Sequence, residues 1–552
     1  MLTWGRWRYA FSAPFRAVRA RRLLRRGSFV SLVIDGGVVE LAEPLPWWRR
    51  KRARSISIAG IRQLCSIIGR DERVKGLLVE IRSLRAGAAT ATSLRRVLLG
   101  LKENQKTVIV YLPTGAGSRE MLVASAAHRI IMGPQATISP LGVAVETRYF
   151  RRTLDKIGVL PEIFARGEFK TAGESLARDS MSAEQREQVG AILDVANDEL
   201  IAALAEGRGL AVDEVRALVD RGPYRAAQER RLVDAVGYDD DLPQLLQTQK
   251  APAHLVDAGP YLSARRTAPL SKRIGVVHVH GPIVSRAPLA FGRVAVDERI
   301  IGALRRAREL RGIAGVILLI DSPGGGVLAS DRIHHEVLRL AEKKPVVAYF
   351  SNVAASGGYY VAAGAHAIVA EPTTLTGSIG VVAGHLVLAP LLDKLGIVTE
   401  LVKRGARADM MSASRPLDEG EREAMTREIE GYYVDFVNVV ARGRHRPADE
   451  IEKLARGRVY SGLEAHRVGL VDHLGGFDVA IDVLREKMKE PRAVGHQVIK
   501  PPRTTPKPPE VPGPFVDAID ALGGRAARDL ATLALGLGSR ETVLAWSGLL
   551  GI

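Results

Sequence analysis

The sequence predicts an α/β protein built from two tandem copies of one βαβ domain. The first observation is a repeat: Tyr111 and His128 recur as Tyr349 and His366, each 238 residues later. A long match at one constant offset indicates an internal duplication. The second observation is an alternation of continuous apolar runs with helical patterns, which is typical of parallel sheets buried on both faces. The third is composition: 552 residues, 46% hydrophobic and 25% charged, are ordinary for a globular protein of several domains.

The βαβ order is clearest in the second repeat. An apolar run, "GVILLI" (315–320), leads into a glycine-rich turn, "DSPGGG" (321–326). A helical pattern (330–344) and another apolar run, "PVVAYF" (345–350), follow. Each repeat is therefore expected to form one domain of about 200 residues.

The composition of the connecting segments sets the domain boundaries. Seven prolines in residues 501–514 indicate an extended spacer, and the tail beyond it has a helical periodicity broken by glycines. We expect this tail to dock on a neighbour or on a membrane. The predicted parts are a basic N-terminal arm (1–54), the first repeat (55–248), a linker (249–272), the second repeat (273–490), a Pro-rich linker (491–514) and a helical tail (515–552).

The positive charge is concentrated in the N-terminal arm. The formal net charge is +18, and residues 1–54 hold 13 Arg and Lys against 3 Asp and Glu. Four of the five tryptophans accompany these basic residues: Trp4, Trp7, Trp47 and Trp48. Arg and Trp on one amphipathic segment favour a helix that lies on anionic lipid, although a solvated arm or a nucleic-acid contact stays open. Outside the arm the excess of charge is small and carries no nucleic-acid motif, so we do not expect a nucleic-acid partner.

Two further features bear on location. The longest uncharged stretch before residue 20 is "YAFSAPF", which is too short for the apolar region of a secretory signal peptide. Cys65 is the only cysteine, which excludes an intrachain disulfide and makes a thiolate metal site implausible. The side of the membrane that the protein faces is left open.

The uncharged segment 352–370, "NVAASGGYYVAAGAHAIVA", has three interpretations. It is long enough for a membrane span, and its alanines suit a buried helix. Neither explains why Ser356 stands directly before Gly357 and Gly358. Glycines without Cβ atoms at the start of a helix let a substrate backbone approach the helix N–H groups. We therefore favour a small-residue helix that presents Ser356 to a substrate.

The glycines distinguish the two repeats. "DSPGGG" and the glycines after Ser356 offer two turns whose N–H groups could converge on a tetrahedral oxyanion. The same places in the first repeat read "SLRAG" (83–87) and "GSRE" (117–120), where Arg119 replaces the glycine after Ser118. The first repeat is therefore not expected to hold an oxyanion.

A serine nucleophile needs a base, and histidine is the usual one. Four histidines lie near in sequence: His334, His335, His366 and His385. The serine contexts "AASGG" and "TGSIG" do not fit G-x-S-x-G, and His366 matches a histidine in the repeat without the glycines. A Ser-His-Asp triad is accordingly the less favoured arrangement.

Lysine is the other candidate base, since burial can make its amine neutral. Lys170 precedes Thr-Ala-Gly in the first repeat, and its counterpart 238 residues later is Ala408. One repeat thus keeps the serine and the other keeps the lysine, which favours a shared site over a plain surface lysine. Lys403 is a reserve candidate.

Four motifs together, "DSPGGG", "AASGGYYVA", "TGSIGV" and "GEFKTAGESLARDSMS", resemble the signal peptide peptidase A family in its long form. The resemblance covers about residues 30–490 and implies two tandem crotonase-like, Clp-protease-like domains. It places the nucleophile on Ser356 and the general base on Lys170. It assigns oxyanion N–H groups to Gly357 and Gly325 and a lysine-orienting hydroxyl to Ser378, for which a helix cap is the alternative.

The resemblance implies a serine endopeptidase that hydrolyses cleaved signal peptides or other short hydrophobic peptides through an acyl-enzyme. It implies no metal and no cofactor, a homo-oligomer (a tetramer), and association with the bacterial inner membrane. Residues 1–54 would supply a peripheral anchor, because an obvious N-terminal transmembrane anchor is not seen. Two alternatives remain: a crotonase-type acyl-CoA hydratase or isomerase, and a catalytically silent membrane-associated scaffold.

Overall fold

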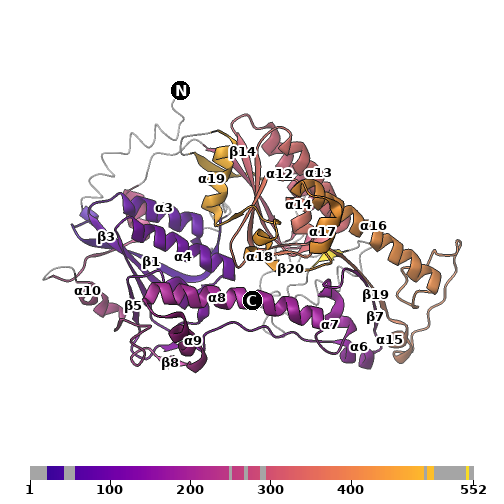
Figure 1. Cartoon of the computed structure of the whole chain (residues 1–552), viewed down its shortest axis with the longest axis horizontal. Helices are drawn as coiled ribbons and strands as arrows, with labels where there is room; N and C mark the ends of the chain where they lie inside the picture. The colour runs from indigo at the N-terminus through magenta and orange to yellow at the C-terminus, as the bar shows by residue number, and fades with distance from the viewer. Residues whose placement is uncertain are drawn as a thin grey trace. The chain divides into compact units, whose positions relative to one another are not determined.

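The structure, a computed structural model, divides the chain into two compact units (Figure 1). The residues described are 22–42, 56–247, 251–265, 272–285, 294–489, 494–502 and 543–545. Unit 1 comprises Met1–Val143, Asp194–Ser271 and Ala493–Gly495, and unit 2 comprises Ala144–Leu193, Lys272–Arg492 and His496–Ile552. The compact units and the sequence repeats are therefore different divisions: residues 144–193 of the first repeat belong to unit 2.

Unit 1 contains a seven-stranded parallel sheet in the order β10-β1-β3-β4-β5-β9, with β2 paired to β1. Its strands are β1 Ser28–Val39, β2 Ile56–Ser57, β3 Val74–Arg85, β4 Thr107–Leu112, β5 Arg129–Met132, β9 Ala235–Val236 and β10 Leu255–Asp257. The central strands are buried on both faces, as their continuous apolar runs predict. A small antiparallel pair, β6 Thr137–Ile138 with β8 Tyr224–Arg225, lies apart from it.

Helices connect the strands of unit 1 in the expected βαβ manner. They are α3 Ile58–Gly69, α4 Ala88–Glu103, α5 Ser118–Ala124, α9 Val212–Arg221, α10 Leu242–Leu245 and α11 Ala258–Ala264. Helix α8, Ala183–Arg208, belongs to unit 2 through Leu193 and to unit 1 thereafter. Ser57 begins α3 because its hydroxyl accepts a hydrogen bond from Gly60 N at 3.2 Å.

Unit 2 is built on an eight-stranded sheet in the order β20-β18-β16-β14-β11-β22, with β17 paired to β16 and β21 paired to β17. The strands are β11 Lys272–His280, β14 Gly315–Ser322, β16 Val346–Ala355, β17 Ala367–Ala370, β18 Leu375–Gly377, β20 Val459–Ser461, β21 His473–Leu474 and β22 Gly495–Val498. The pairs β11-β14, β14-β16 and β16-β18 are parallel. Their carboxyl ends therefore meet at one edge of the sheet, where the glycine turn and Ser356 lie.

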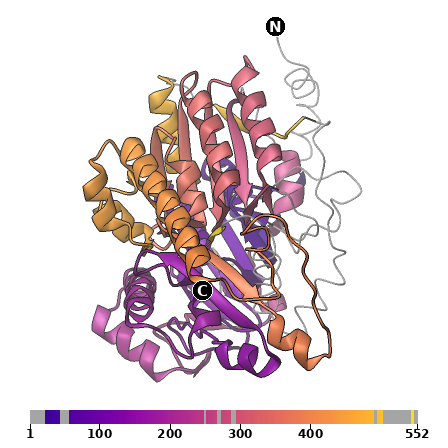
Figure 2. The ribbon, with the colours of Figure 1, turned by 90° about the vertical axis from the view of Figure 1, so that its right-hand side faces the viewer.

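Helices cover both faces of this sheet, with α19 on one face and α12 and α13 side by side on the other (Figures 1 and 2). The helices of unit 2 are α6 Arg151–Ile157, η1 Thr171–Gly173, α7 Glu174–Ala177, α12 Asp297–Glu309, α13 Val327–Ala341, α14 Gly357–Ala362, α15 Ala389–Lys394, α16 Glu419–Arg444, α17 Ala448–Leu454, α18 Gly462–Arg467 and α19 Phe477–Lys487. Asp418 and Glu421 form a capping box at the start of α16.

A second sheet in unit 2 joins segments that are far apart in the sequence. Its order is β13-β12-β15-β23-β19-β7. The strands are β7 Leu160–Arg166, β12 Ile283–Val284, β13 Ala295–Val296, β15 Gly324–Gly326, β19 Val381–Val387 and β23 Val543–Ala545. β7 comes from the first repeat and pairs antiparallel with β19 over seven residue pairs. Through this pairing, the segment that contains Lys170 belongs to unit 2.

Several segments expected to be connections form regular structure. The predicted arm 1–54 contains β1, because Phe29, Val30 and Ile34 are buried in the sheet. The predicted linker 249–272 supplies β10 and α11, and 491–514 supplies β22. The proposed lipid-binding helix of residues 4–18 lies outside the described residues. Only Val543–Ala545 of the tail 515–552 is described, and it is a strand.

The uncharged segment 352–370 is neither a membrane span nor one continuous helix. It forms the end of β16, the six-residue helix α14 and the strand β17. Ala354 to Gly364 are all buried, so the small side chains serve close packing inside the unit. Of the helices that the structure describes, none is both long and apolar enough to cross a membrane.

Candidate active site

Ser356 stands at the junction between β16 and α14, at the carboxyl edge of the large sheet. Its backbone has φ 53° and ψ −117°, a conformation that non-glycine residues rarely adopt. Ser356 N donates to Gly377 O at 2.8 Å, and Tyr360 N donates to Ser356 O at 2.9 Å. These bonds hold the strained turn, as is common where a side chain must be presented for chemistry.

Lys170 follows β7 and reaches Ser356 within the same chain. Lys170 Nζ lies 2.8 Å from Ser356 Oγ, 2.9 Å from Ser378 O and 3.0 Å from Ser378 Oγ. Lys170 is 4% exposed, and both serines are fully buried. A neutral amine has two N–H groups and one lone pair, which matches two bonds donated to Ser378 and one accepted from the Ser356 hydroxyl.

Burial controls the charge of this amine. Desolvation lowers the pKa of Lys170 from 10.5 to about 7. At neutral pH a large share of the lysine is therefore unprotonated and able to accept a proton. The site thus pairs a serine hydroxyl with a base of suitable pKa at hydrogen-bond distance.

The two glycines expected to bind an oxyanion also lie together. A Cβ atom placed on Gly357 would lie 3.1 Å from Gly325 N, so the N-terminus of α14 and the strand β15 are in close contact. It would also lie 2.4 Å from Ser330 Oγ, and a Cβ on Gly325, where φ is +158°, would lie 1.9 Å from Ile283 O. A side chain at either position would therefore force the two backbones apart.

The loop between α17 and β20 forms the wall beside Lys170. Phe169 N donates to Arg456 O at 2.8 Å, and Ser378 N donates to Arg458 O at 2.7 Å. Gly457 has φ +78°, and a Cβ there would lie 2.5 Å from Lys170 N. The same loop therefore positions both the lysine and the serine that binds it.

Gln188 of α8 is a supporting residue that the sequence interpretation missed. It is 2% exposed, and its Nε2 donates to Thr171 Oγ1 at 2.9 Å and to Phe169 O at 3.3 Å. Its Oε1 accepts from Val459 N at 3.1 Å. One amide thus joins both neighbours of Lys170 to β20. The sequence contained a signal for this residue. Gln188 is the sixth residue of α8, whereas the sixth residue of the repeat-related helix α16 is Ala424, so the amide occurs in the repeat that keeps Lys170 and is absent from this position of the other repeat.

The strand β23 lies between β15 and β19 at this site. Gly324, Gly325 and Gly326 pair antiparallel with Ala545, Leu544 and Val543, respectively. On the other side, Val382 of β19 also pairs with Val543. The glycine strand therefore has an adjoining position that accepts an extended, antiparallel segment.

The serine equivalent to Ser356 and the reserve lysine are arranged differently. Ser118 begins α5, but its Oγ donates to Gly142 O at 2.7 Å and accepts from Gly142 N at 3.0 Å. Lys403, the reserve base, is 39% exposed in its side chain and forms an ion pair with Asp409 at 2.7 Å. Neither residue is part of the arrangement around Ser356.

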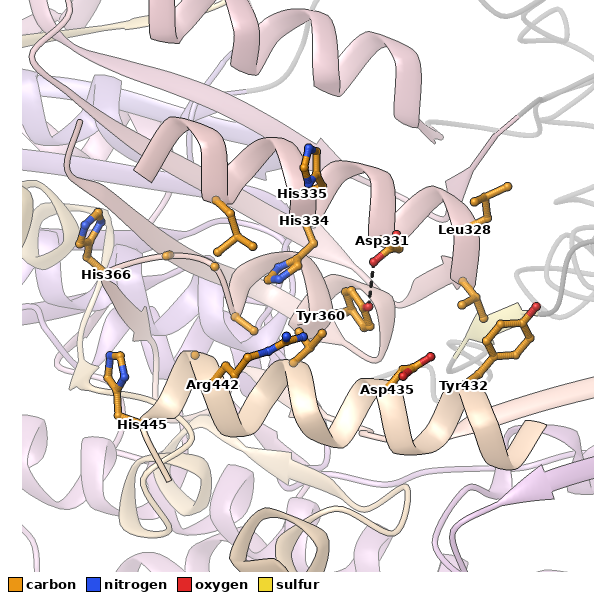
Figure 3. A pocket seen from close by; sticks show the side chains of 17 residues that line it. Leu328, Asp331, His334, His335, Tyr360, His366, Tyr432, Asp435, Arg442 and His445 are labelled. Carbon is orange, nitrogen blue, oxygen red and sulfur yellow. Dashed lines mark hydrogen bonds between the residues drawn. The ribbon is translucent and has the colours of Figure 1, made fainter. Parts of the chain in front are cut away.

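The candidate histidine bases have other positions. His334 and His335 of α13 and His366 line a pocket of about 840 Å³, together with Arg442 of α16 and His445, the residue that follows this helix (Figure 3). Burial lowers the pKa of His334 to about 4. His385 is hydrogen-bonded to Glu162 Oε2 at 2.8 Å and to Ser412 O at 3.0 Å. Among the described residues, Lys170 is the basic side chain that contacts Ser356 Oγ.

The comparison with protein families agrees with this architecture. The profile of peptidase family S49 matches twice, over residues 100–252 and 339–490. The chain belongs to peptidase family S49. The family profile matches once in each half of this S49 peptidase, which confirms the predicted tandem repeat and the predicted family.

Relatives of this S49 peptidase carry related names. The chloroplastic serine protease SPPA of Arabidopsis thaliana is 31% identical over 88% of this chain and 72% of its own length. Protease 4 of Haemophilus influenzae is 29% identical over 75% of this chain and 70% of its own. A protein of Enterococcus faecium, named provisionally as signal peptide peptidase SppA, is 38% identical over 40% of this chain and 64% of its own.

The buried lysine predicts a pH-dependent stability difference. Between about pH 7 and the normal lysine pKa, the unfolded chain binds one more proton than the folded chain, so Lys170 makes stability rise with pH in this window. Lys170→Met removes this dependence. We expect the Tm of the variant, relative to wild type, to be highest near pH 7 and to fall toward pH 10. Thermal melts across this range test it, with Lys403→Met as the exposed control. A difference that does not change with pH would contradict the assigned pKa.

Proposed function

We propose that this S49 peptidase is a serine endopeptidase that uses a Ser-Lys dyad, with Ser356 as the nucleophile and Lys170 as the general base. The observation that carries the proposal is the 2.8 Å contact between Lys170 Nζ and Ser356 Oγ in a buried site. A lysine whose pKa is about 7 can act as a base at neutral pH without a histidine.

Acylation begins when the neutral Lys170 amine takes the proton of the Ser356 hydroxyl. Ser356 Oγ attacks the carbonyl carbon of the scissile peptide bond, and the carbonyl electrons move onto oxygen. The N–H groups of Gly357 and Gly325 stabilise this oxyanion. The intermediate then collapses: the C–N bond breaks, and the leaving amine receives the proton from the Lys170 ammonium. The products are an acyl-enzyme ester and a free amine.

Deacylation reverses these roles with water as the nucleophile. Lys170 takes a proton from water, and the hydroxide oxygen attacks the ester carbon. The second oxyanion collapses with cleavage of the bond to Ser356 Oγ, which recovers its proton from Lys170. Ser378 accepts two hydrogen bonds from the amine throughout, so the lone pair stays directed at the reacting oxygen.

Substrates would bind as extended strands beside β15, where β23 lies in the structure. Backbone pairing on both sides suits an unfolded segment better than a folded protein. The names of the relatives support cleaved signal peptides or other short hydrophobic peptides as substrates. Such substrates accumulate at membranes, and we propose that the basic, Trp-containing parts of residues 1–54 that flank β1 hold the enzyme at the surface of the bacterial inner membrane.

Removal of either dyad residue tests the mechanism. We expect Ser356→Ala and Lys170→Ala each to lower kcat/KM for a fluorogenic hydrophobic peptide by at least about a thousandfold, and the double variant to be no worse than either. Ser118→Ala, in the equivalent position of the first repeat, is the matched control and should keep activity. Cleavage that persists in Lys170→Ala would place the base elsewhere. Acyl-CoA hydration retained by Ser356→Ala would instead support the crotonase-type alternative.

The activity of the wild-type enzyme should rise with pH. Protonated Lys170 has no lone pair to accept the Ser356 proton, so kcat/KM is expected to increase as the lysine loses its proton, with a midpoint at about pH 7. A pH profile of peptide cleavage measures this. A profile that falls across the same range would exclude a neutral lysine as the base.

The position of β23 predicts competition between the tail and substrates. A chain without residues 515–552 should bind peptides more tightly, with a KM lower by several-fold and an unchanged kcat, because Val543–Ala545 no longer occupies the strand position beside β15. A synthetic peptide of residues 540–548 should inhibit the shortened enzyme competitively, whereas a scrambled peptide should not. An unchanged KM would show that the tail does not compete in solution.

A further inference from the structure

A groove between α13 and α16 of unit 2 lies outside the proposed peptidase site. It has a volume of about 840 Å³, and its walls combine apolar residues of both helices with charged and imidazole side chains. Figure 3 shows His334 of α13 and Arg442 of α16 pointing toward each other across this groove. None of the residues that line it is among those proposed for the site around Ser356.

The first repeat contains the same arrangement of helices. There α8 packs against the end of α5, and in the second repeat α16, which also has 26 residues, packs against the end of α14. A Cβ atom on Gly207 of α8 would lie 2.0 Å from Ser125 O, and one on Gly443 of α16 would lie 2.1 Å from Ala363 O. Because both glycines are the twenty-fifth residue of their helix, these matching contacts show which residues of α8 and α16 are equivalent.

The side chains that join the two long helices differ between the repeats. In the first repeat, Arg95 is the eighth residue of α4, and its Nη2 donates to Glu206 Oε2, on the twenty-fourth residue of α8, at 2.5 Å. Arg95 Nε also donates to Ser125 Oγ at 2.8 Å. In the second repeat, the eighth residue of α13 is His334 and the twenty-fourth residue of α16 is Arg442. Two hydrogen-bond donors therefore stand where the first repeat has an arginine and its carboxylate.

His334 lacks the kind of partner that the first repeat provides. It is 6% exposed, and among the described side chains its Nδ1 is buried with no hydrogen-bond partner, which is unfavourable. Burial lowers the pKa of His334 to about 4, so the ring is neutral at pH 7 and has one N–H to donate. Arg442 keeps its positive charge. Together these two side chains suit a carboxylate in the place that Glu206 takes in the first repeat.

The groove has donors toward one end and carboxylates toward the other. His366 and His445 lie toward the first end, and Asp331 and Asp435 lie toward the second (Figure 3). His366 Nδ1 accepts a hydrogen bond from Val346 N at 3.1 Å, which leaves the proton of the ring on Nε2 for donation. The other residues that line the groove are largely apolar. This distribution suits an apolar molecule with one negative and one positive end.

We propose that this groove binds a short apolar peptide, whose terminal carboxylate lies between His334 and Arg442 and whose ammonium group faces Asp435. Asp435 and Arg442 are seven residues apart on α16, which corresponds to a rise of about 10.5 Å. An extended peptide of about three residues covers this length. Such peptides are products that a peptidase releases. That source of the ligand rests on the proposed function, whereas the binding site itself does not.

Calorimetric titration of the full-length Ser356→Ala variant measures binding without turnover. The probe is the tripeptide Leu-Val-Leu, which we expect to bind. Its C-terminal amide should bind at least about tenfold more weakly, because it lacks the charge that pairs with Arg442. The N-acetylated peptide should also bind more weakly, through loss of the ammonium group that faces Asp435. Hexanoate has the carboxylate on an apolar chain without an ammonium group, and hexanoate binding as tight as that of the peptide would overturn the assignment of a peptide.

Exchange of the groove residues for those of the first repeat separates this groove from the proposed active site. In the same parent, Arg442→Glu should weaken binding of the free peptide by at least about tenfold. The double variant His334→Arg with Arg442→Glu recreates the ion pair of the first repeat, so it should lose binding while its Tm stays equal to that of the parent or rises. Arg339→Glu makes the same charge change on α13 outside the groove, where the arginine side chain is 55% exposed, and should bind like the parent.

Three results would overturn the inference. The first is binding that neither exchange weakens, because the peptide would then lie elsewhere on the protein. The second is equal affinity for the peptide and its amide, and the third is no measurable binding of the free peptide at millimolar concentration. Peptide cleavage by the wild-type protein is a separate measurement: its absence would contradict the proposed function, and the titrations would still decide whether the groove binds peptides.

Discussion

The burial of an amine against a serine hydroxyl is the constraint on which the rest of unit 2 depends. An ammonium group enclosed by protein without a counter-charge is unfavourable, and this cost lowers the pKa of Lys170. The surrounding structure must therefore hold the lysine in place against its tendency to reach water. The β7-β19 ladder, the loop at Gly457 and the amide of Gln188 all serve this purpose. The pairing of the two repeats is thus part of the site itself.

The duplication explains why one site draws on two repeats. The second repeat retains the glycine strand and the strained turn at Ser356, and the first retains Lys170 on a segment that crosses into unit 2. The unused counterparts have other contacts: Ser118 is bonded to Gly142, and Ala408 cannot act as a base. Each repeat has kept what the shared site requires.

The glycine strand combines two roles at one place. β15 lies against the N-terminus of α14, where an oxyanion would form, and on the side away from β12 it pairs with the extended segment β23. A substrate bound there would have its backbone fixed close to Ser356 by main-chain bonds that do not depend on side-chain identity. Selectivity would then come from which segments are unfolded and apolar, a property that suits peptides released at a membrane.

The sequence by itself determined the duplication, the α/β class and the family, and it predicted the residues that we propose for the site. Three features are visible in the sequence alone: the constant offset of 238 residues, the apolar runs, and the retention of Ser356 in one repeat and of Lys170 in the other. Only the tertiary structure decided that the lysine meets the serine within one chain, because this depends on the antiparallel pairing of β7 with β19 across the repeats. The same holds for Gln188, whose role arises from contacts with two distant backbones, and for the strands within the predicted arm and linkers. Long-range pairing places these residues, and sequence periodicity carries no information about which strand lies beside which.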